Sequence, residues 1–282
     1  MADTFSPLIR ASDLLKIYNN ETLVLVDASN IPRISYEKRH LDSALFVDVN
    51  TELADIKEDL AKGGRHPLPD IKDFSETLAK LGINRNSHVV VYDEKNGSNA
   101  AARFWWMLKS VGHEKVQVLD GGFQAAEKVG FPINSDIEIP KKSGNYLAER
   151  WLLPLADMNE VEEISRDENH LVIDVRDSER FRGEKEPIDL IAGHIPGAIN
   201  IPLTTNMDEN GLFLSPDQLK GKYQETLEKF PAGNVIVHCG SGVSACHTLL
   251  AIAQAGLEIP KLYVGSWSEW SRNNKEIATT DR

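Results

Sequence analysis

The sequence predicts an α/β protein built from two similar domains in tandem. Short apolar runs alternate with helix-like segments, this succession occurs twice, and a polar stretch without periodicity separates the two copies. Apolar runs that lack polar alternation are typical of parallel strands covered on both faces. Their alternation with helices predicts a mainly parallel sheet flanked by helices in each domain.

The repeat can be followed segment by segment. Strand-like and helix-like segments correspond, in chain order, as 23–28 with 171–176, 74–81 with 216–229, 89–93 with 235–239, and 116–122 with 261–266. The helix at 216–229 carries its own start signal, with Ser215 as N-cap, Pro216 in the first turn and Gln218 at the capping-box position. We expect domains at 1–138 and 155–282, joined by a linker over 139–154.

Composition excludes several classes of protein. The chain has 282 residues and a formal net charge of −12, which is unfavourable for binding nucleic acid or an anionic membrane. Its two cysteines suggest neither a disulfide framework nor a zinc site. No apolar run approaches a membrane span, and the N-terminus does not read as a signal peptide. We expect a cytoplasmic protein with no metal or organic cofactor.

The most informative residue is Cys239, at the end of the apolar run 235–239. A loop of small residues follows it, and then an apolar helix-like stretch, 245–255. Peptide N–H groups in such a loop, at a helix N-terminus, form a cradle for an anion. They would favour a reactive thiolate, although a buried structural cysteine at a strand end is the alternative. The repeat places Asp93 opposite Cys239, so the first domain lacks the nucleophile.

The loop does not fit a cysteine phosphatase. Those enzymes need an arginine six residues after the cysteine to hold the phosphate dianion, and Ala245 occupies that position here. Phosphate-ester and arsenate chemistry are therefore disfavoured.

Residues 239–245, Cys-Gly-Ser-Gly-Val-Ser-Ala, resemble the active loop of the rhodanese superfamily, in particular its 3-mercaptopyruvate sulfurtransferases. Further matching stretches extend the resemblance over essentially the whole chain; they are 104–107, 174–176, 180–183, 193–198 and 265–270. The resemblance implies two tandem rhodanese-like domains, a catalytically silent first domain and a site between the domains.

The resemblance also implies a mechanism. Cys239 would take sulfur from a small anionic donor as a persulfide, held by a substrate-binding loop of Gly240, Gly242, Val243 and Ser244. The outer sulfur would then pass to cyanide, a small thiol or a thioredoxin-like protein, in a ping-pong reaction.

Three further side chains are assigned through the resemblance. Arg180 would bind the donor's carboxylate or sulfonate, although a surface salt bridge with a neighbouring glutamate is the alternative. His66 would reach toward Ser241 and assist proton movement, whereas a lone loop histidine is more often simply exposed. Ser241 and Ser244 are also candidates for plain loop capping.

Other residues near the motif are expected to be structural. Arg176 is expected to brace the loop, and His238 and Cys246 to be packed, with a resolving-thiol role as the alternative for Cys246.

The pattern departs from the family in two places that bear on the donor. Ile188 stands where mercaptopyruvate enzymes carry a second substrate arginine, and Asn50 stands where relatives often have an acidic partner for the histidine. The neutral loop favours 3-mercaptopyruvate, and the missing arginine favours thiosulfate. We expect 3-mercaptopyruvate, by a narrow margin, and keep thiosulfate as the alternative donor. A non-enzymatic persulfide carrier is the alternative from another class.

Overall fold

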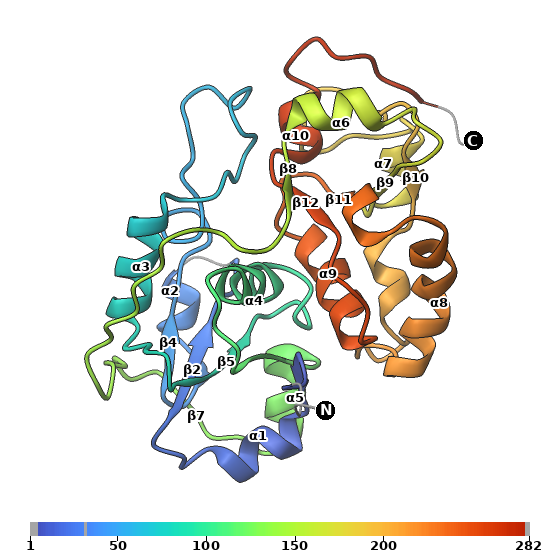
Figure 1. The fold of residues 1–282 in the computed structure, drawn as a ribbon. Coiled ribbons are helices and arrows are strands. Elements are labelled where there is room, and N and C mark those ends of the chain that lie inside the picture. The colour runs from blue at the N-terminus through green and yellow to red at the C-terminus, as the bar shows by residue number, and fades with distance from the viewer. Residues whose placement is uncertain (1–4, 31–32, 280–282) are drawn as a thin grey trace. The chain divides into compact units, whose positions relative to one another are not determined.

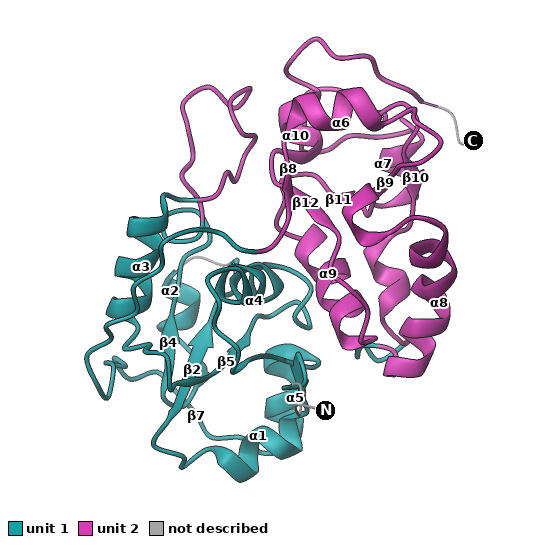
Figure 2. Ribbon diagram, viewed as in Figure 1, with its two compact units in different colours: residues 1–53, 69–152, 209–213 teal, residues 54–68, 153–208, 214–282 magenta. Residues whose placement is uncertain are grey.

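The computed structural model describes residues 5–30 and 33–279, which form two compact units. Unit 1 comprises residues 1–53, 69–152 and 209–213, and unit 2 comprises residues 54–68, 153–208 and 214–282 (Figure 2). Each unit contains one five-stranded sheet with helices around it (Figure 1). The predicted α/β class is therefore confirmed.

The two units do not divide the chain at a single point. The segment 54–68 comes from the first half of the sequence but belongs to unit 2, where the Gly63 N–H donates to Glu269 at 2.8 Å. Conversely, the segment 209–213 belongs to unit 1, where the Phe213 N–H donates to Asp120 at 2.9 Å. Each half of the sequence thus contributes a short segment to the unit built mainly from the other half.

Unit 1 is built around a parallel sheet with strand order β1-β6-β5-β2-β4. A separate antiparallel pair, β3 and β7, accompanies it. The elements of unit 1 are β1 (Leu8–Ile9), α1 (Ala11–Ile17), β2 (Leu23–Asp27), α2 (Arg33–Tyr36), β3 (His40–Leu41), β4 (Ala44–Phe46), α3 (Ile71–Lys80), β5 (His88–Tyr92), α4 (Ala100–Ser110), β6 (Val116–Leu119), α5 (Gly122–Lys128) and β7 (Ile133–Asn134).

Unit 2 repeats this sheet, with parallel strands in the order β10-β9-β11-β12-β8. Its elements are β8 (Leu155–Ala156), α6 (Met158–Ile164), β9 (Leu171–Asp174), α7 (Ser178–Phe181), β10 (Ile199–Asn200), η1 (Leu203–Asn206), α8 (Pro216–Lys229), η2 (Ala232–Asn234), β11 (Val235–His238), α9 (Ala245–Gln254), β12 (Lys261–Tyr263) and α10 (Ser266–Trp270).

Sequence features explain the elements that position the loop after β11. All four residues of β11 are buried, as expected for a central strand with both faces covered. In α9, every residue from Ala245 to Ile252 is buried, as expected for a helix with apolar residues on all sides. On α8, Ser215 and Gln218 form the reciprocal capping box that the sequence predicts.

Several strands end earlier than the apolar runs suggest. The chain leaves β5 before Asp93, β9 before Val175 and β11 before Cys239. Because the strands are parallel, their carboxyl ends share one edge of each sheet, where α/β proteins commonly place their sites. No helix in the described residues is long and apolar enough to cross a membrane.

Candidate functional site

Cys239 is the first residue after β11 and is almost completely buried. Its N–H donates to the Ser266 hydroxyl at 3.2 Å, and its carbonyl accepts from the Trp267 N–H at 3.0 Å. The Ser268 N–H likewise donates to the carbonyl of Gly240 at 2.9 Å. The start of α10 therefore fixes the backbone on which the thiol is carried.

The loop 240–244 offers backbone donors that the protein does not use. Among the described residues, no acceptor receives the N–H groups of Gly240, Ser241, Val243 or Ser244. Gly242 turns the loop with φ +73°, and a Cβ atom there would lie 2.3 Å from the Val264 carbonyl oxygen. Unused amides at the start of a buried helix suit an anion.

His66 and Ser241 lie together in unit 2. The His66 Nδ1 and Ser241 Oγ atoms are 2.8 Å apart, a hydrogen-bonding distance. The segment 54–68 carries the histidine, and the Arg65 N–H donates to the Ser268 hydroxyl at 3.0 Å, which ties this segment to α10. A hydroxyl of the thiol loop thus has a direct imidazole partner.

Arg180 is buried in a cluster of charges. Its guanidinium donates to Glu186 through Nε at 3.1 Å and through Nη2 at 2.7 Å, and Nη2 also meets Asp189 at 3.2 Å. Burial opposes ionisation of Glu186, but its hydrogen bonds with Arg180 hold the pKa of that carboxyl below its usual value. The glutamate partner foreseen as an alternative for Arg180 is present, yet the pair is buried at the loop and not on the surface.

Arg176 holds the architecture around the loop. It donates to Asp174 at 2.6 Å and to the Gly193 carbonyl at 2.6 Å, and its guanidinium lies 4.6 Å from the centre of the Trp267 ring. Burial opposes ionisation of Asp174, but Arg176 keeps its pKa below the usual value. Next to this pair, burial lowers the pKa of His238, although the charge of Asp174 opposes this shift.

The remaining residues of the motif are placed as follows. Ser244 occupies the N-cap position of α9 but makes no side-chain capping bond. Cys246 is fully buried in α9, and its Sγ lies 3.4 Å from the Gly242 carbonyl oxygen. Ile188 exposes 55% of its surface, so this position contributes neither a charge nor a buried contact.

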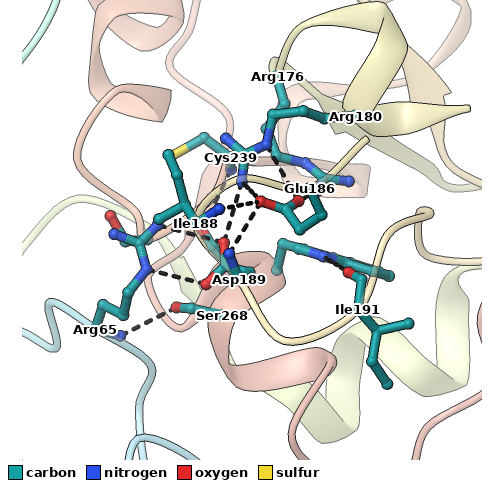
Figure 3. A network of polar contacts seen from close by, with 12 residues as sticks. Arg65, Arg176, Arg180, Glu186, Ile188, Asp189, Ile191, Cys239 and Ser268 are labelled. Carbon is teal, nitrogen blue, oxygen red and sulfur yellow. Dashed lines mark hydrogen bonds and ion pairs between the residues drawn. The ribbon is translucent and has the colours of Figure 1, made fainter. Parts of the chain in front are cut away.

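Sequence reasoning missed three charged residues of this site, namely Arg65, Arg272 and Asp189, and the side chain of Asp189 is inaccessible to solvent. Asp189 accepts from Arg65 Nε at 2.9 Å, from Arg180 Nη2 at 3.2 Å and from Arg272 Nη1 at 3.2 Å. Figure 3 shows this network beside Cys239. Two signals pointed to it: Arg65 adjoins the predicted His66, and Asp189 follows Ile188, the position of the missing arginine.

The equivalent loop of unit 1 is built differently. Asp93 follows β5 as Cys239 follows β11, and its carboxylate accepts four backbone N–H groups, from Lys95 and Gly97 at 2.8 Å, Asn99 at 3.0 Å and Ala101 at 3.2 Å. Burial raises the pKa of Asp93, and these hydrogen bonds oppose the rise. The side chain itself fills the amide cradle.

Comparison with known proteins agrees with this geometry. The protein-family model of the rhodanese-like domain matches this sequence twice, over residues 10–128 and 157–273. The probable 3-mercaptopyruvate sulfurtransferase of Pseudomonas aeruginosa is 37% identical over 87% of this chain and 86% of its own length. Human 3-mercaptopyruvate sulfurtransferase is 34% identical over 89% and 85%, respectively. A putative thiosulfate sulfurtransferase of Mycobacterium tuberculosis is 36% identical over 84% and 82%.

Solved structures give the same result. The 3-mercaptopyruvate sulfurtransferase of Leishmania major is 27% identical and superposes with a TM-score of 0.80, over 94% of this chain and 74% of that one. Both halves of the chain match the family model, and relatives above 30% identity span most of its length. The chain therefore belongs to the rhodanese family, with two rhodanese-like domains in tandem.

Proposed function

We propose that this sulfurtransferase moves a sulfur atom from 3-mercaptopyruvate, through a persulfide on Cys239, to a nucleophilic acceptor. The support comes from the relatives' activities and from the surroundings of the thiol. The observation that carries the proposal is the set of unused N–H groups on the loop 240–244, next to a buried thiol. Such donors stabilise a negatively charged sulfur without any metal.

In the first half-reaction, the Cys239 thiolate attacks the sulfur of the donor. A sulfur–sulfur bond forms, the carbon–sulfur bond breaks, and its electron pair leaves with the enolate of pyruvate. The proton of the donor thiol moves to the enolate carbon, which completes pyruvate and leaves a persulfide anion. We assign this proton movement to the Ser241 hydroxyl and His66, which are in hydrogen-bonding contact.

In the second half-reaction, the acceptor attacks the outer sulfur of the persulfide. The sulfur–sulfur bond breaks, its electron pair returns to Cys239 as the thiolate, and the acceptor leaves with the sulfur. Cyanide would give thiocyanate, and a thiol would give a new persulfide. A small thiol or a thioredoxin-like protein is our proposed physiological acceptor. This sequence is covalent catalysis with ping-pong kinetics.

Thiosulfate is the second candidate donor, because Ile188 supplies no guanidinium at the position where mercaptopyruvate enzymes have one. With thiosulfate, the thiolate attacks the outer sulfur and sulfite leaves with the electron pair. No proton is transferred in that reaction. Proton transfer by His66 is therefore needed with 3-mercaptopyruvate but not with thiosulfate.

The test is a comparison of kcat/KM for the two donors with cyanide as acceptor, together with the mass of the protein after donor treatment. We expect turnover of 3-mercaptopyruvate and a mass increase of one sulfur atom that Cys239→Ser abolishes. A Cys239→Ser variant that kept its turnover would exclude this function. A higher kcat/KM for thiosulfate would replace the donor but retain the mechanism.

A further inference from the structure

Arg65 and Arg180 converge on the same point of the thiol loop. A Cβ atom placed on Gly240 would lie 3.0 Å from Arg65 Nη2 and 3.5 Å from both Arg180 Nη2 and the Asp189 Oδ2 that these guanidiniums share. Gly240 directly follows Cys239, so both guanidiniums lie beside the loop that carries the thiol. Arg65 comes from the segment 54–68 and Arg180 from α7, and Figure 3 shows both of them reaching Asp189 next to Cys239.

The charge of this cluster does not cancel. Six ion pairs link four guanidiniums to three carboxylates, so one positive charge remains without a partner in the cluster; the members are Arg65, Arg176, Arg180, Arg272, Asp174, Glu186 and Asp189. The surplus is unusual in a chain with a net charge of −12. A net positive charge in the cluster favours the binding of an anionic donor.

The two guanidiniums also keep donors in reserve. Arg65 uses Nε and Nη2 on Asp189, and Arg180 uses Nε and Nη2 on Glu186 and Asp189. In the part of the chain that the structure describes, neither Nη1 group donates a hydrogen bond. Arginine binds a carboxylate through two parallel N–H groups. The contacts with Asp189 hold both guanidiniums in place.

We infer that Arg65 is a specificity-determining residue that, with Arg180, binds the carboxylate of a monoanionic 2-oxo acid donor, and so takes the role that the arginine missing at position 188 has in related enzymes. This inference rests on the proposed sulfur transfer from 3-mercaptopyruvate. Arg65 binds the donor, and the segment that carries it also supplies His66, which handles the proton.

The test replaces the guanidinium and separates binding from turnover. Arg65→Gln is expected to raise KM for 3-mercaptopyruvate about tenfold to a hundredfold, the usual effect of losing charge-assisted hydrogen bonds, with a much smaller change in kcat. KM for cyanide should stay within about twofold, because cyanide acts after the donor's carbon skeleton has left. Arg65→Lys keeps the charge but not the fork, and should give an intermediate KM.

Arg272→Gln is the matched control. It removes another guanidinium from Asp189, but Arg272 is not among the three nearest neighbours of Gly240. Because Arg272→Gln also removes the surplus charge of the cluster, we expect KM for 3-mercaptopyruvate to rise by up to about threefold, well below the rise in Arg65→Gln. An unchanged KM in Arg65→Gln, or an equal rise in Arg272→Gln, would show that Arg65 only supports Asp189 and would overturn the inference.

A binding measurement makes the result independent of turnover. Pyruvate, titrated calorimetrically into Cys239→Ala, should bind about tenfold or more weakly when Arg65→Gln is added. If the wild type transferred no sulfur from 3-mercaptopyruvate while pyruvate binding still depended on Arg65, the proposed function would fail and the carboxylate site would stand. If sulfur transfer occurred and the affinity for pyruvate were unchanged by Arg65→Gln, the inference alone would fail.

Discussion

The loops after β5 and β11 start from the same position of the same fold but use their backbone amides differently. In unit 1, the Asp93 carboxylate occupies four backbone N–H groups permanently. In unit 2, the smaller Cys239 side chain leaves comparable amides unused. The difference teaches that a fixed carboxylate completes the cradle of unit 1, whereas the cradle of unit 2 stays open for the sulfur that we propose it binds.

Replacing Cys239 with the aspartate that unit 1 has at this position is the strongest way to break this comparison. Cys239→Asp should place a carboxylate among the loop amides and lower sulfur transfer by more than about a thousandfold, because no persulfide can form. The thermal midpoint should not fall, because the new carboxylate satisfies the amides. Transfer assays and thermal unfolding measure the two effects, and Cys239→Ser, inactive without the added carboxylate, is the control. Residual activity near the wild-type level would refute the comparison.

Asp93→Ala tests the other side of the comparison. Four amides would lose their acceptor in a buried loop, and we expect unit 1 to lose about 3 kcal/mol of stability. Sulfur transfer at low temperature should be unchanged, since Asp93 makes its contacts within unit 1. Urea unfolding followed by amide exchange of α4 would measure the loss. Asp93→Asn, which keeps one carbonyl acceptor, should lose less; equal losses would argue against amide binding as the cause.

His66→Gln tests whether the thiol loop of unit 2 uses this histidine for proton transfer. General acid–base partners contribute about a hundredfold or more, so kcat with 3-mercaptopyruvate should fall by about that factor. With thiosulfate, the decrease should be less than about fivefold, because that reaction transfers no proton. Fixed-time assays with both donors measure the decrease in kcat for each and hence the ratio of the two decreases. Equal decreases would mean that His66 only positions Ser241.

The turning glycines of the two loops give a smaller contrast. Gly242 and Gly97 both have positive φ, +73° and +78°. A Cβ on Gly242 would lie 2.3 Å from the Val264 carbonyl oxygen, whereas one on Gly97 would lie 2.7 Å from a side-chain methyl group of Val118, a longer contact and one that does not involve the backbone. We expect Gly242→Ala to cost about 2 kcal/mol or more and Gly97→Ala about 1 kcal/mol, measured by urea unfolding. The reverse order would contradict the structure.

One buried histidine in each unit predicts that the stability of the protein decreases at acidic pH. Burial lowers the pKa of His113 in unit 1 to about 4 and that of His247 in unit 2 to about 3. Unfolded histidines bind protons near pH 6.5, so stability is complete above that pH and falls as the pH decreases toward these folded values. The slope is at most about 1.4 kcal/mol per pH unit for each residue.

Thermal midpoints measured from pH 7 to pH 4 check this effect. His113→Gln and His247→Gln should each flatten the decrease, while the partly exposed His170, replaced in the same way, should leave it nearly unchanged. A decrease that was the same in all the variants would assign the acid sensitivity to other titratable groups.

The sequence predicted the fold because its signals are local. The apolar runs marked β2, β5, β9 and β11, and the capping box marked the start of α8. The edge strands β1 and β8 escaped prediction because each has only two residues, too few to show a pattern.

The candidate site was predicted only in part, for a similar reason. Cys239, Ser241 and Arg180 stand in motifs that can be read along the chain. The contact of Arg65 with Asp189 joins residues 124 positions apart, and only the folded chain brings them together. The roles of these residues stay predictions until the variants are measured.

The exchange of short segments has a consequence for how this protein can be dissected. A fragment cut at the linker and containing residues 153–282 would carry the thiol loop but neither Arg65 nor His66, which the segment 54–68 supplies. A purified fragment of this kind would thus have the proposed nucleophile without its histidine. During synthesis on the ribosome, the proposed sulfur-binding centre stays incomplete until β12 and α10 have emerged to meet a loop made about two hundred residues earlier.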